Sequence, residues 1–343
     1  MPLDFKPIEC FDITAWEAKP QFSRYGKRLK DVYESPKGDL YYFKQSDLRY
    51  PWEFWCEIIA SKLGQSLGLD IADYNTAVIQ NGNDDGSDLW GCMSTLLQKE
   101  NQAFIHGQEY LLEIDPGFDT KKGTSHSYQL IRKVLKMQNL DHQLDHLHEM
   151  IAFDALICNR DRHQENWAIL QTTATTKPTM ETPGVVKKTF VLPDEEGHKT
   201  ELDYYQHSRL SPIYDNGTSL GHNLTEDGLT MHLRDEERMM RFAAGKKSQT
   251  HIRWNGKKLK HDDLIANIYH SESESMARTL KKVIESHDEN VLNEILEGVD
   301  RCYDQDNEVY KLTRIRQEFI VRLLTLRHHL LQRLFNSLTT IDH

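Results

Sequence analysis

The chain has 343 residues, a hydrophobic fraction of 38% and a net charge of −11 from 42 basic and 53 acidic residues. This length suits two domains or lobes. The acidic balance argues against nucleic acid as the main partner, because phosphate backbones are bound by basic faces. The sequence predicts neither a signal peptide nor a membrane-spanning helix. Its five cysteines are scattered without a C-x-x-C pair, which predicts a cytoplasmic protein without a zinc site.

The first hundred residues predict a small sheet with one helix. A run that begins with Pro predicts a helix over residues 51–67, with Ile59, Leu63 and Leu67 on its buried side. Apolar and aromatic runs predict strands at residues 11–16, 32–35, 40–44, 73–80 and 89–97.

The remainder of the chain predicts a mainly helical part. Residues 101–128 look irregular, so we place a hinge near residues 98–107 and divide the chain into lobes 1–103 and 104–343. Residues 171–210 predict an inserted hairpin, and residues 216–262 look polar and irregular. Helices are expected at residues 128–137, 141–157, 264–269, 276–286, 291–299 and 307–338, the last with a core stripe of Leu312, Ile315, Phe319, Leu323, Leu326, Leu330 and Leu334. The expected fold class is α+β.

Polar residues that follow an apolar helix predict a phosphoryl-transfer site. Asp161 and Asn166 stand five positions apart on one loop, and Asp215 follows in a separate segment. Phosphoryl transfer needs an orienting carboxylate beside the attacking hydroxyl and oxygen ligands for a divalent metal. Asp161 suits the first task, and Asn166 with Asp215 suits the second. A lone pair with this spacing is common by chance, so the prediction depends on the other elements of the chain.

Two charged residues upstream add to this pattern. Lys44 ends a predicted strand and Glu57 lies on the predicted helix thirteen residues later. Each could be an ordinary surface charge, or Glu57 could pair with Lys44 and direct it to nucleotide phosphates. The polar loop of residues 23–30, with Gly26 and Lys27, is a candidate cover for those phosphates. An ordinary surface turn explains the loop about equally well.

Two further clusters have competing interpretations. His142 and His146 have helical spacing that can bind metal, although a polar helix face explains them better. Basic residues surround Trp254 and predict a solvated loop or a docking site for an acidic protein substrate, in preference to a nucleic-acid patch. They are Lys246, Lys247, Arg253, Lys257, Lys258 and Lys260.

The motif Asn159-x-Asp161-Arg162-His163-x-x-Asn166, followed by Ser211-Pro212-Ile213-Tyr214-Asp215, resembles the HipA-type serine/threonine kinases of bacterial toxin–antitoxin modules. The resemblance spans residues 40–220 and implies a two-lobed protein-kinase-like fold. It implies ATP and Mg²⁺ as cofactors, and a translation protein such as an aminoacyl-tRNA synthetase as the substrate. A small antitoxin is a candidate partner, whereas direct binding to nucleic acid or membrane is not expected.

The resemblance also implies roles for individual residues. Asp161 is the catalytic base, Lys44 binds the ATP phosphates with Glu57 as its partner, and His163 shapes the loop together with Arg162. Asn166 and Asp215 are the metal ligands. The remaining candidates are Gly26, Lys27 and Gln98 for nucleotide binding and Ser23 for autophosphorylation.

The sequence departs from the family pattern at Glu165, where many relatives have lysine. The longer toxins also carry an N-terminal domain that contacts the antitoxin, and this chain resembles the compact relatives. The motif around Asp161 is shared with phosphoinositide kinases, and related arrangements serve small-molecule kinases. These enzymes, and a pseudokinase binding module, are the alternative functions.

Overall fold

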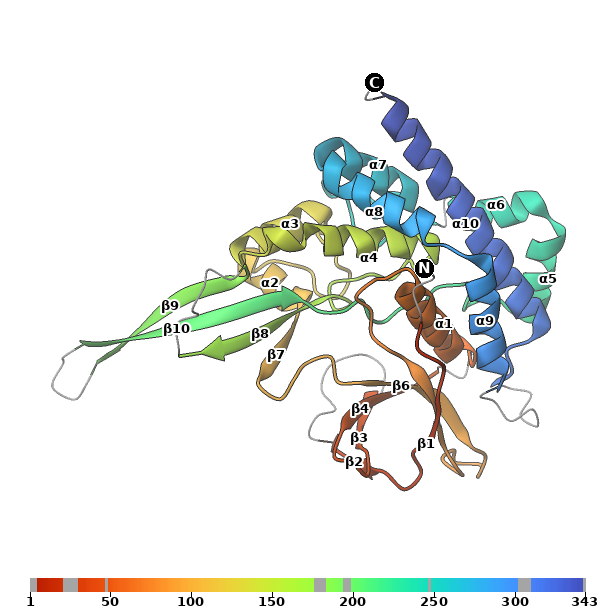
Figure 1. The fold of residues 1–343 in the computed structure, drawn as a ribbon, viewed down its shortest axis with the longest axis horizontal. Coiled ribbons are helices and arrows are strands. Elements are labelled where there is room, and N and C mark those ends of the chain that lie inside the picture. The colour runs from red at the N-terminus through yellow and green to blue at the C-terminus, as the bar shows by residue number, and fades with distance from the viewer. Residues whose placement is uncertain are drawn as a thin grey trace.

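The computed structural model describes residues 5–20, 30–46, 49–175, 183–193, 199–245, 248–301 and 310–341. A β-rich part and a helical part lie at opposite ends of the molecule, with a projecting group of strands between them (Figure 1). No helix in the described ranges is long and apolar enough to cross a membrane. The four cysteines in these ranges (Cys10, Cys56, Cys92 and Cys158) are free.

The N-terminal part is built on a six-stranded sheet in the order β1-β5-β6-β4-β3-β2. Its strands are β1 (Cys10–Asp12), β2 (Glu17–Ala18), β3 (Lys30–Glu34), β4 (Leu40–Gln45), β5 (Asn75–Ile79) and β6 (Leu89–Thr95). Among the described strands of this sheet, β1 and β5 alone pair in parallel. The predicted strand 11–16 is confirmed only at its start: β1 ends at Asp12, and a turn in which Trp16 N donates to the Ile13 carbonyl leads to β2.

Helix α1 (Glu53–Ser66) lies between this sheet and the helical part (Figure 1). The predicted stripe of Ile59, Leu63 and Leu67 is too narrow, because nearly the whole circumference of α1 is buried. Such burial is typical of a helix in the interior, covered on several sides. Trp55 Nε1 donates to the carbonyl of Tyr310 at 2.6 Å, so α1 is also tied to the C-terminal part of the chain.

The expectation of irregular structure over residues 101–128 is wrong in its first half. Strand β7 (Gln102–His106) and helix α2 (Gly107–Ile114) occupy it. Strand β7 pairs with β8 (Ala168–Ala174), 62 to 70 residues further along the chain, so no local pattern reveals it. The chain thus enters a second sheet at Gln102.

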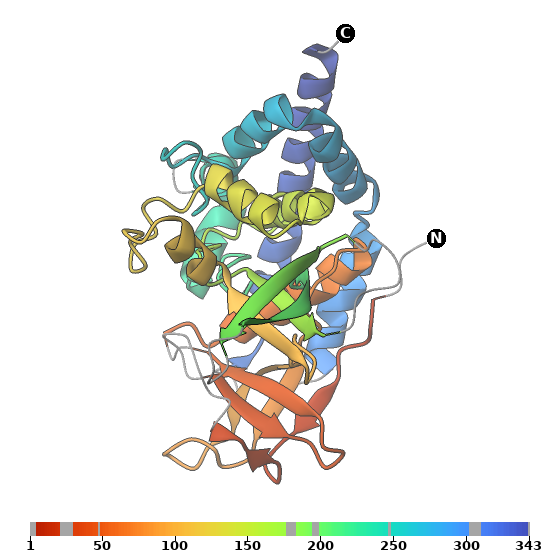
Figure 2. The same cartoon turned by 90° about the vertical axis from the view of Figure 1, so that its left-hand side faces the viewer.

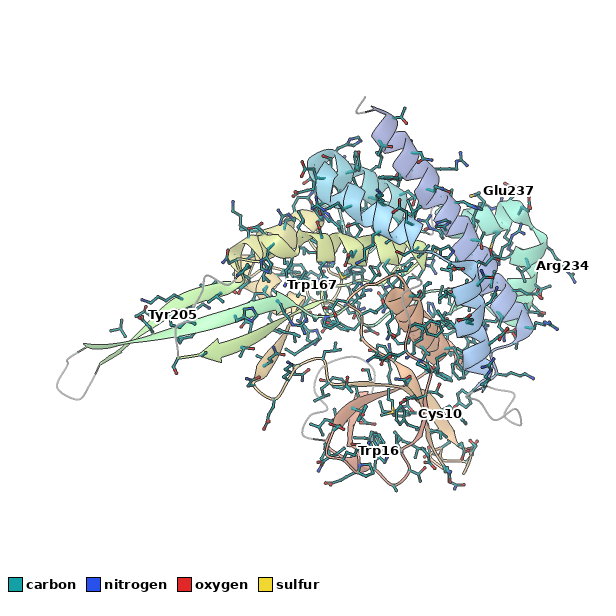
Figure 3. All side chains as sticks on the ribbon, viewed as in Figure 1. Cys10, Trp16, Trp167, Tyr205, Arg234 and Glu237 are labelled. Atoms are coloured by element: carbon teal, nitrogen blue, oxygen red, sulfur yellow. The ribbon has the colours of Figure 1, made fainter. Side chains whose placement is uncertain are left out.

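This second sheet has the order β7-β8-β10-β9. Strands β9 (Val185–Pro193) and β10 (Lys199–Leu210) form the hairpin that the sequence predicts within residues 171–210. It extends away from the body of the molecule (Figure 1). In Figure 3, Tyr205 lies on this arm, whereas Trp167 lies among the packed side chains near the centre.

The C-terminal part is helical and shares one core with α1. Its helices are α3 (Tyr128–Met137), a 3₁₀ turn (Asp141–Gln143), α4 (Leu144–Leu156), α5 (Glu226–Arg234), α6 (Glu236–Ala244), α7 (His261–Ser271), α8 (Ser273–Glu285), α9 (Glu289–Arg301) and α10 (Arg314–Ile341).

Two expectations for this helical part are wrong. The range 216–262 is not irregular throughout, because α5 and α6 lie in it. They pack against α10 through a small cluster that includes Leu229, Met239 and Phe319. In α10, Ile315 is exposed and does not belong to the core stripe, and Leu312 precedes the helix.

Candidate active site

A buried cluster of three charges joins the two parts of the molecule. The Nζ atom of Lys44, on β4, lies 2.9 Å from Oε2 of Glu57, on α1, and 2.5 Å from Oδ1 of Asp215. Burial alone would lower the pKa of Lys44, but the carboxylates of Asp215 and Glu57 outweigh it and raise the pKa above its ordinary value. Lys44 is therefore a fixed cation at neutral pH.

Backbone pairing places Asp215 beside Lys44. The Ile213 amide donates to the Asp70 carbonyl and the Ala72 amide donates to the Ile213 carbonyl, both at 2.8 Å. The segment that follows α1 thus holds the segment before Asp215. Asp215 itself has a φ of 59°, a left-handed conformation that costs most residues energy and that Asp tolerates better than most. The turn that it makes directs the chain back past α1.

Glu57 receives hydrogen bonds from this turn as well as from Lys44. Its Oε1 accepts from the amide of Asn216 at 2.6 Å, and its Oε2 accepts from the amide of Gly217 at 3.0 Å. A Cβ atom at Gly217 would lie 3.2 Å from the carboxylates of Glu53 and Glu57. Glycine therefore lets the backbone approach α1 closely. Glu57 orients both Lys44 and the segment that carries Asp215.

The loop between α4 and β8 is organised by Arg162, which is fully buried. Its guanidinium donates to both carboxylate oxygens of Asp154, at 2.7 and 3.0 Å. It also donates to the carbonyls of Asn166 and Tyr214 and to Oδ1 of Asn216. Burial opposes the charge, but Asp154 outweighs it and raises the pKa of Arg162. One side chain thus links the loop to the segment around Asp215.

Asp161 and Asn166 lie on opposite limbs of this loop and are connected. The Asn166 side-chain amide donates to the Asp161 carbonyl at 2.7 Å, and the Asp161 amide donates to Oδ1 of Asn159 at 3.1 Å. These bonds commit the nitrogen of Asn166 and leave its Oδ1 as the atom that can bind a cation. Asp161 is partly exposed on the same loop.

Glu165, the departure from the family pattern, is fixed through its backbone. Its carbonyl accepts from Tyr214 Oη at 2.7 Å and lies 2.8 Å from His106 Nδ1. Its side chain is 38% exposed, and the carboxylate lies 3.9 Å from His163 Nδ1. His163 also accepts from the Glu165 amide at 3.1 Å. The extra negative charge therefore lies beside His163.

The other predicted residues divide into two groups. Gln98 lies between β6 and β7, at the connection between the two sheets, and its Oε1 is buried without a hydrogen-bond partner in the described residues. Ser23, Gly26 and Lys27 lie outside the described residues.

The predicted metal-binding alternative at His142 and His146 gains no support. His146 Nε2 lies 2.9 Å from the carbonyl oxygen of Ser211, and His142 packs near Gly184. In the ranges that the structure describes, no three His, Cys, Asp or Glu side chains are grouped as a metal site. A site made of one Asp, one Asn and phosphate oxygens would not require such a group.

The sequence interpretation missed Asp154 and Asn216. Asp154 is a carboxylate inside the apolar run 151–157, and a buried charge needs a partner. The need for a partner could have indicated the ion pair with Arg162, eight residues away. Asn216 had no such signal, because its importance depends on the meeting of Glu57 and Arg162 from distant parts of the chain.

The residues present suit a nucleotide with a divalent metal. Lys44 is a buried cation, Asp215 and Asn166 offer hard oxygen ligands, and Gln98 has an unused buried acceptor where the two sheets connect. The arrangement can bind phosphates, hold a metal and accept a proton at Asp161.

Solved structures with this fold include kinases. The chain is similar to the Helicobacter pylori proinflammatory kinase CtkA, with a TM-score of 0.70 and 15% identity over 96% of this chain and 98% of that chain. Two further structures are similar with TM-scores below 0.5. The first is HipA from Shewanella oneidensis MR-1, in complex with HipB and operator DNA, with a TM-score of 0.46 and 12% identity over 96% of this chain and 67% of that one. The second is the Golgi casein kinase with Mn and ADP bound, with a TM-score of 0.41 and 13% identity over 98% and 75%.

The chain matches no protein-family model and no curated protein at a significant level. The similarity to CtkA confirms the predicted resemblance to kinases at the level of the fold: the chain has an α+β, two-lobed kinase-like fold.

Proposed function

We propose that this chain is an ATP- and Mg²⁺-dependent serine/threonine protein kinase of the HipA type. The observation that carries the proposal is the cluster of Lys44, Glu57 and Asp215, in which a strand, a helix and a segment 171 residues from Lys44 converge. A structural ion pair alone would not require the adjoining loop with Asp161 and Asn166. Residues 1–103 form the nucleotide clamp and residues 104–343 form the catalytic lobe.

Each residue has one task in this proposal. Lys44 binds the nucleotide phosphates, and Glu57 keeps it in place. Asn166 and Asp215 hold the metal, which neutralises phosphate oxygens when it is bound. Asp161 takes the proton of the attacking hydroxyl, and Gln98 offers an acceptor to the nucleotide base. Glu165, near His163, does not supply the cation that many HipA-type kinases have at that position.

The biological setting follows from the family resemblance. We propose a protein of the translation machinery, such as an aminoacyl-tRNA synthetase, as the substrate, and a small antitoxin as a partner. Ser23 is the proposed autophosphorylation site.

The proposal is tested by offering three classes of acceptor with γ-labelled ATP and Mg²⁺: a bacterial lysate, phosphoinositide vesicles and small-molecule acceptors. We expect label on serine or threonine of proteins, identified by mass spectrometry, and no label with Asp161→Asn. Label on lipid or on a small molecule alone would refute a protein kinase. Binding of ATP with no transfer to any acceptor would identify a pseudokinase.

A further inference from the structure

Two loops with exposed lysines flank the proposed catalytic loop: the turn 119–123 and the loop 251–258. Gln164 Nε2, three residues after Asp161, donates to the Thr120 carbonyl at 2.7 Å. A Cβ atom at Gly123, where φ is +56°, would lie 2.5 Å from Gln164 Oε1 and 2.9 Å from His251 Cε1. The proposed catalytic loop, the turn 119–123 and the loop 251–258 are therefore in contact around Gly123. Figure 2 shows both loops on the left side of the helical part.

The loop 251–258 is firmly attached to the same region. The amide of Arg253 donates to the His126 carbonyl and the amide of Tyr128 donates to the Arg253 carbonyl, both at 2.9 Å. The ring of Trp254 stacks on Tyr128 at 5.5 Å between centroids. The ring of His251 lies edge-on to His163, at 6.0 Å. These contacts make the loop a fixed surface beside the catalytic loop.

The lysines of these two loops are not neutralised. Lys121, Lys122, Lys257 and Lys258 are exposed. None of the four forms an ion pair with any carboxylate in the described ranges. The nearby carboxylate of Asp119 accepts the backbone amides of Lys121 and Lys122 and closes the turn. In a chain with a net charge of −11, four lysines without a carboxylate partner in the described ranges make these two loops locally basic.

The positive charge of these loops affects the pKa of the neighbouring His251. Burial, followed by the charges of His163, Lys258 and Arg253, lowers the pKa of His251 to about 4. His251 is therefore neutral at pH 7 and adds no charge. The positive charge of the surface comes from the lysines and Arg253, whose Nη1 donates to the Gly256 carbonyl.

We propose that the turn 119–123 and the loop 251–258 form a docking surface for an acidic peptide segment that flanks the phosphorylated serine or threonine. The inference rests on the proposed kinase function and adds the class of substrate sequence to it. Charge complementarity favours carboxylate side chains as the occupant. The loop residues that contact this surface, His163 and Gln164, follow Asp161 by two and three positions. A bound acidic segment would therefore place its neighbouring hydroxyl near that carboxylate. Nucleic acid is less suited, because the rest of the chain is acidic and would repel a long polyanion.

The test compares two peptides that differ only in charge: one serine flanked by Glu and Asp, and the same peptide with Gln and Asn. Transfer of labelled phosphate is measured for the wild type, Lys257→Ala/Lys258→Ala and Lys121→Ala/Lys122→Ala. The control is Lys133→Ala/Lys136→Ala, which removes two exposed lysines from α3. We expect the wild type and the control to prefer the acidic peptide about tenfold in kcat/KM, mainly through KM. The two docking variants should lose most of this preference, and 0.5 M salt should reduce it in the wild type.

Equal use of the two peptides by the wild type, or the same preference in all variants, would overturn the docking surface. Binding of fluorescent peptides, measured by anisotropy, separates this inference from the proposed function. Binding that depends on the four lysines without any transfer would contradict the kinase function and support the surface. Tighter binding of polyuridine RNA than of the acidic peptide would overturn the surface as a peptide site.

Discussion

Two groups of charges in this protein differ in burial and in pairing. The cluster of Lys44, Glu57 and Asp215 is buried or nearly so, and each charge has a partner from another element. The lysines of residues 119–123 and 251–258 are exposed, and none has a carboxylate partner in the described ranges. Buried charges persist only with partners, because their removal from water is costly. Exposed charges need none, so they remain available to a ligand.

The comparison assigns different tasks to the two groups. The buried cluster holds its three side chains in fixed positions, as expected of groups that position a reacting phosphate. A small displacement of these side chains should therefore reduce the rate. The exposed lysines can add affinity and selectivity without a fixed geometry. Changes in the buried group should therefore reduce the rate strongly, and changes in the exposed group should alter substrate preference mildly.

The largest effect is expected at Asp161, on the loop between α4 and β8. Asp161→Asn should reduce phosphate transfer about 10³-fold, because the amide cannot accept the hydroxyl proton. Labelled-phosphate transfer measures the rate, and thermal unfolding checks that the fold is intact. A rate within threefold of the wild type would exclude Asp161 as the base.

Replacing Arg162 tests how much its buried hydrogen bonds and its ion pair contribute to the stability of the fold. Arg162→Ala leaves Asp154 buried without its cation, so we expect a loss of about 4 kcal/mol in the free energy of unfolding. Urea denaturation gives this value. The matched control is Arg278→Ala, which breaks a pair with Asp145 that is about half exposed at each side chain; there the loss should stay below about 1 kcal/mol. Similar losses in the two variants would contradict the distinction between buried and exposed charges.

Glu57 tests the positioning of Lys44. Glu57→Gln keeps the shape but weakens the bonds to Lys44 and to the amides of Asn216 and Gly217, so transfer should fall about 10²-fold. Asp73→Asn is the control, since it weakens the ion pair of Lys62, a buried residue of the same helix, away from the site. That control should lose stability and keep its rate per folded molecule. An equal loss of rate in both variants would mean that Glu57 affects the rate only through the stability of the fold.

Acid should lower the stability of the fold through His261, a buried residue next to the ion pair of Arg327 and Asp262. Burial, followed by the charge of Arg327, lowers the pKa of His261 to about 3. The unfolded state, with a pKa near 6.5, takes up a proton first as the pH falls, so stability is full above pH 6.5 and decreases below it. The contribution of His261 to this loss should be about 2 kcal/mol between pH 6.5 and 4.5, measured by urea denaturation.

His261→Phe removes this titration and should make the decline with pH shallower by about that amount. The slope would stay unchanged if His261 took up its proton equally in the folded and unfolded states, and the account of its burial would then be wrong.

The sequence predicts the elements whose signals are local. Helix α3 has the predicted limits, because Ser127 caps it and its apolar residues recur at helical spacing. The order of Lys44, Glu57, Asp161, Asn166 and Asp215 was visible from residue types and spacing alone. The contacts among these residues were not, since they depend on pairing between residues up to 171 positions apart.

The missed elements have only short apolar patterns. Helices α5 and α6 are mostly polar and hold their places through a few residues such as Leu229 and Met239, which pack against α10. Their caps, Thr225 and Asp235, were the available signals. Strand β7 is defined by its partner β8. The four exposed lysines belong to two loops that are about 130 residues apart in the sequence, so only the fold brings them together.

The most direct test of the account is the metal dependence of phosphate transfer at Asp215. Transfer of the γ-phosphate of labelled ATP to a protein serine or threonine is measured with Mg²⁺ from 0 to 20 mM, for the wild type and for Asp215→Asn. The account predicts transfer by the wild type that requires Mg²⁺ and is lost with EDTA, and a rate about 10³-fold lower in Asp215→Asn at every Mg²⁺ concentration. Transfer that proceeds equally well without a divalent metal, or equal rates in the two proteins, would contradict it.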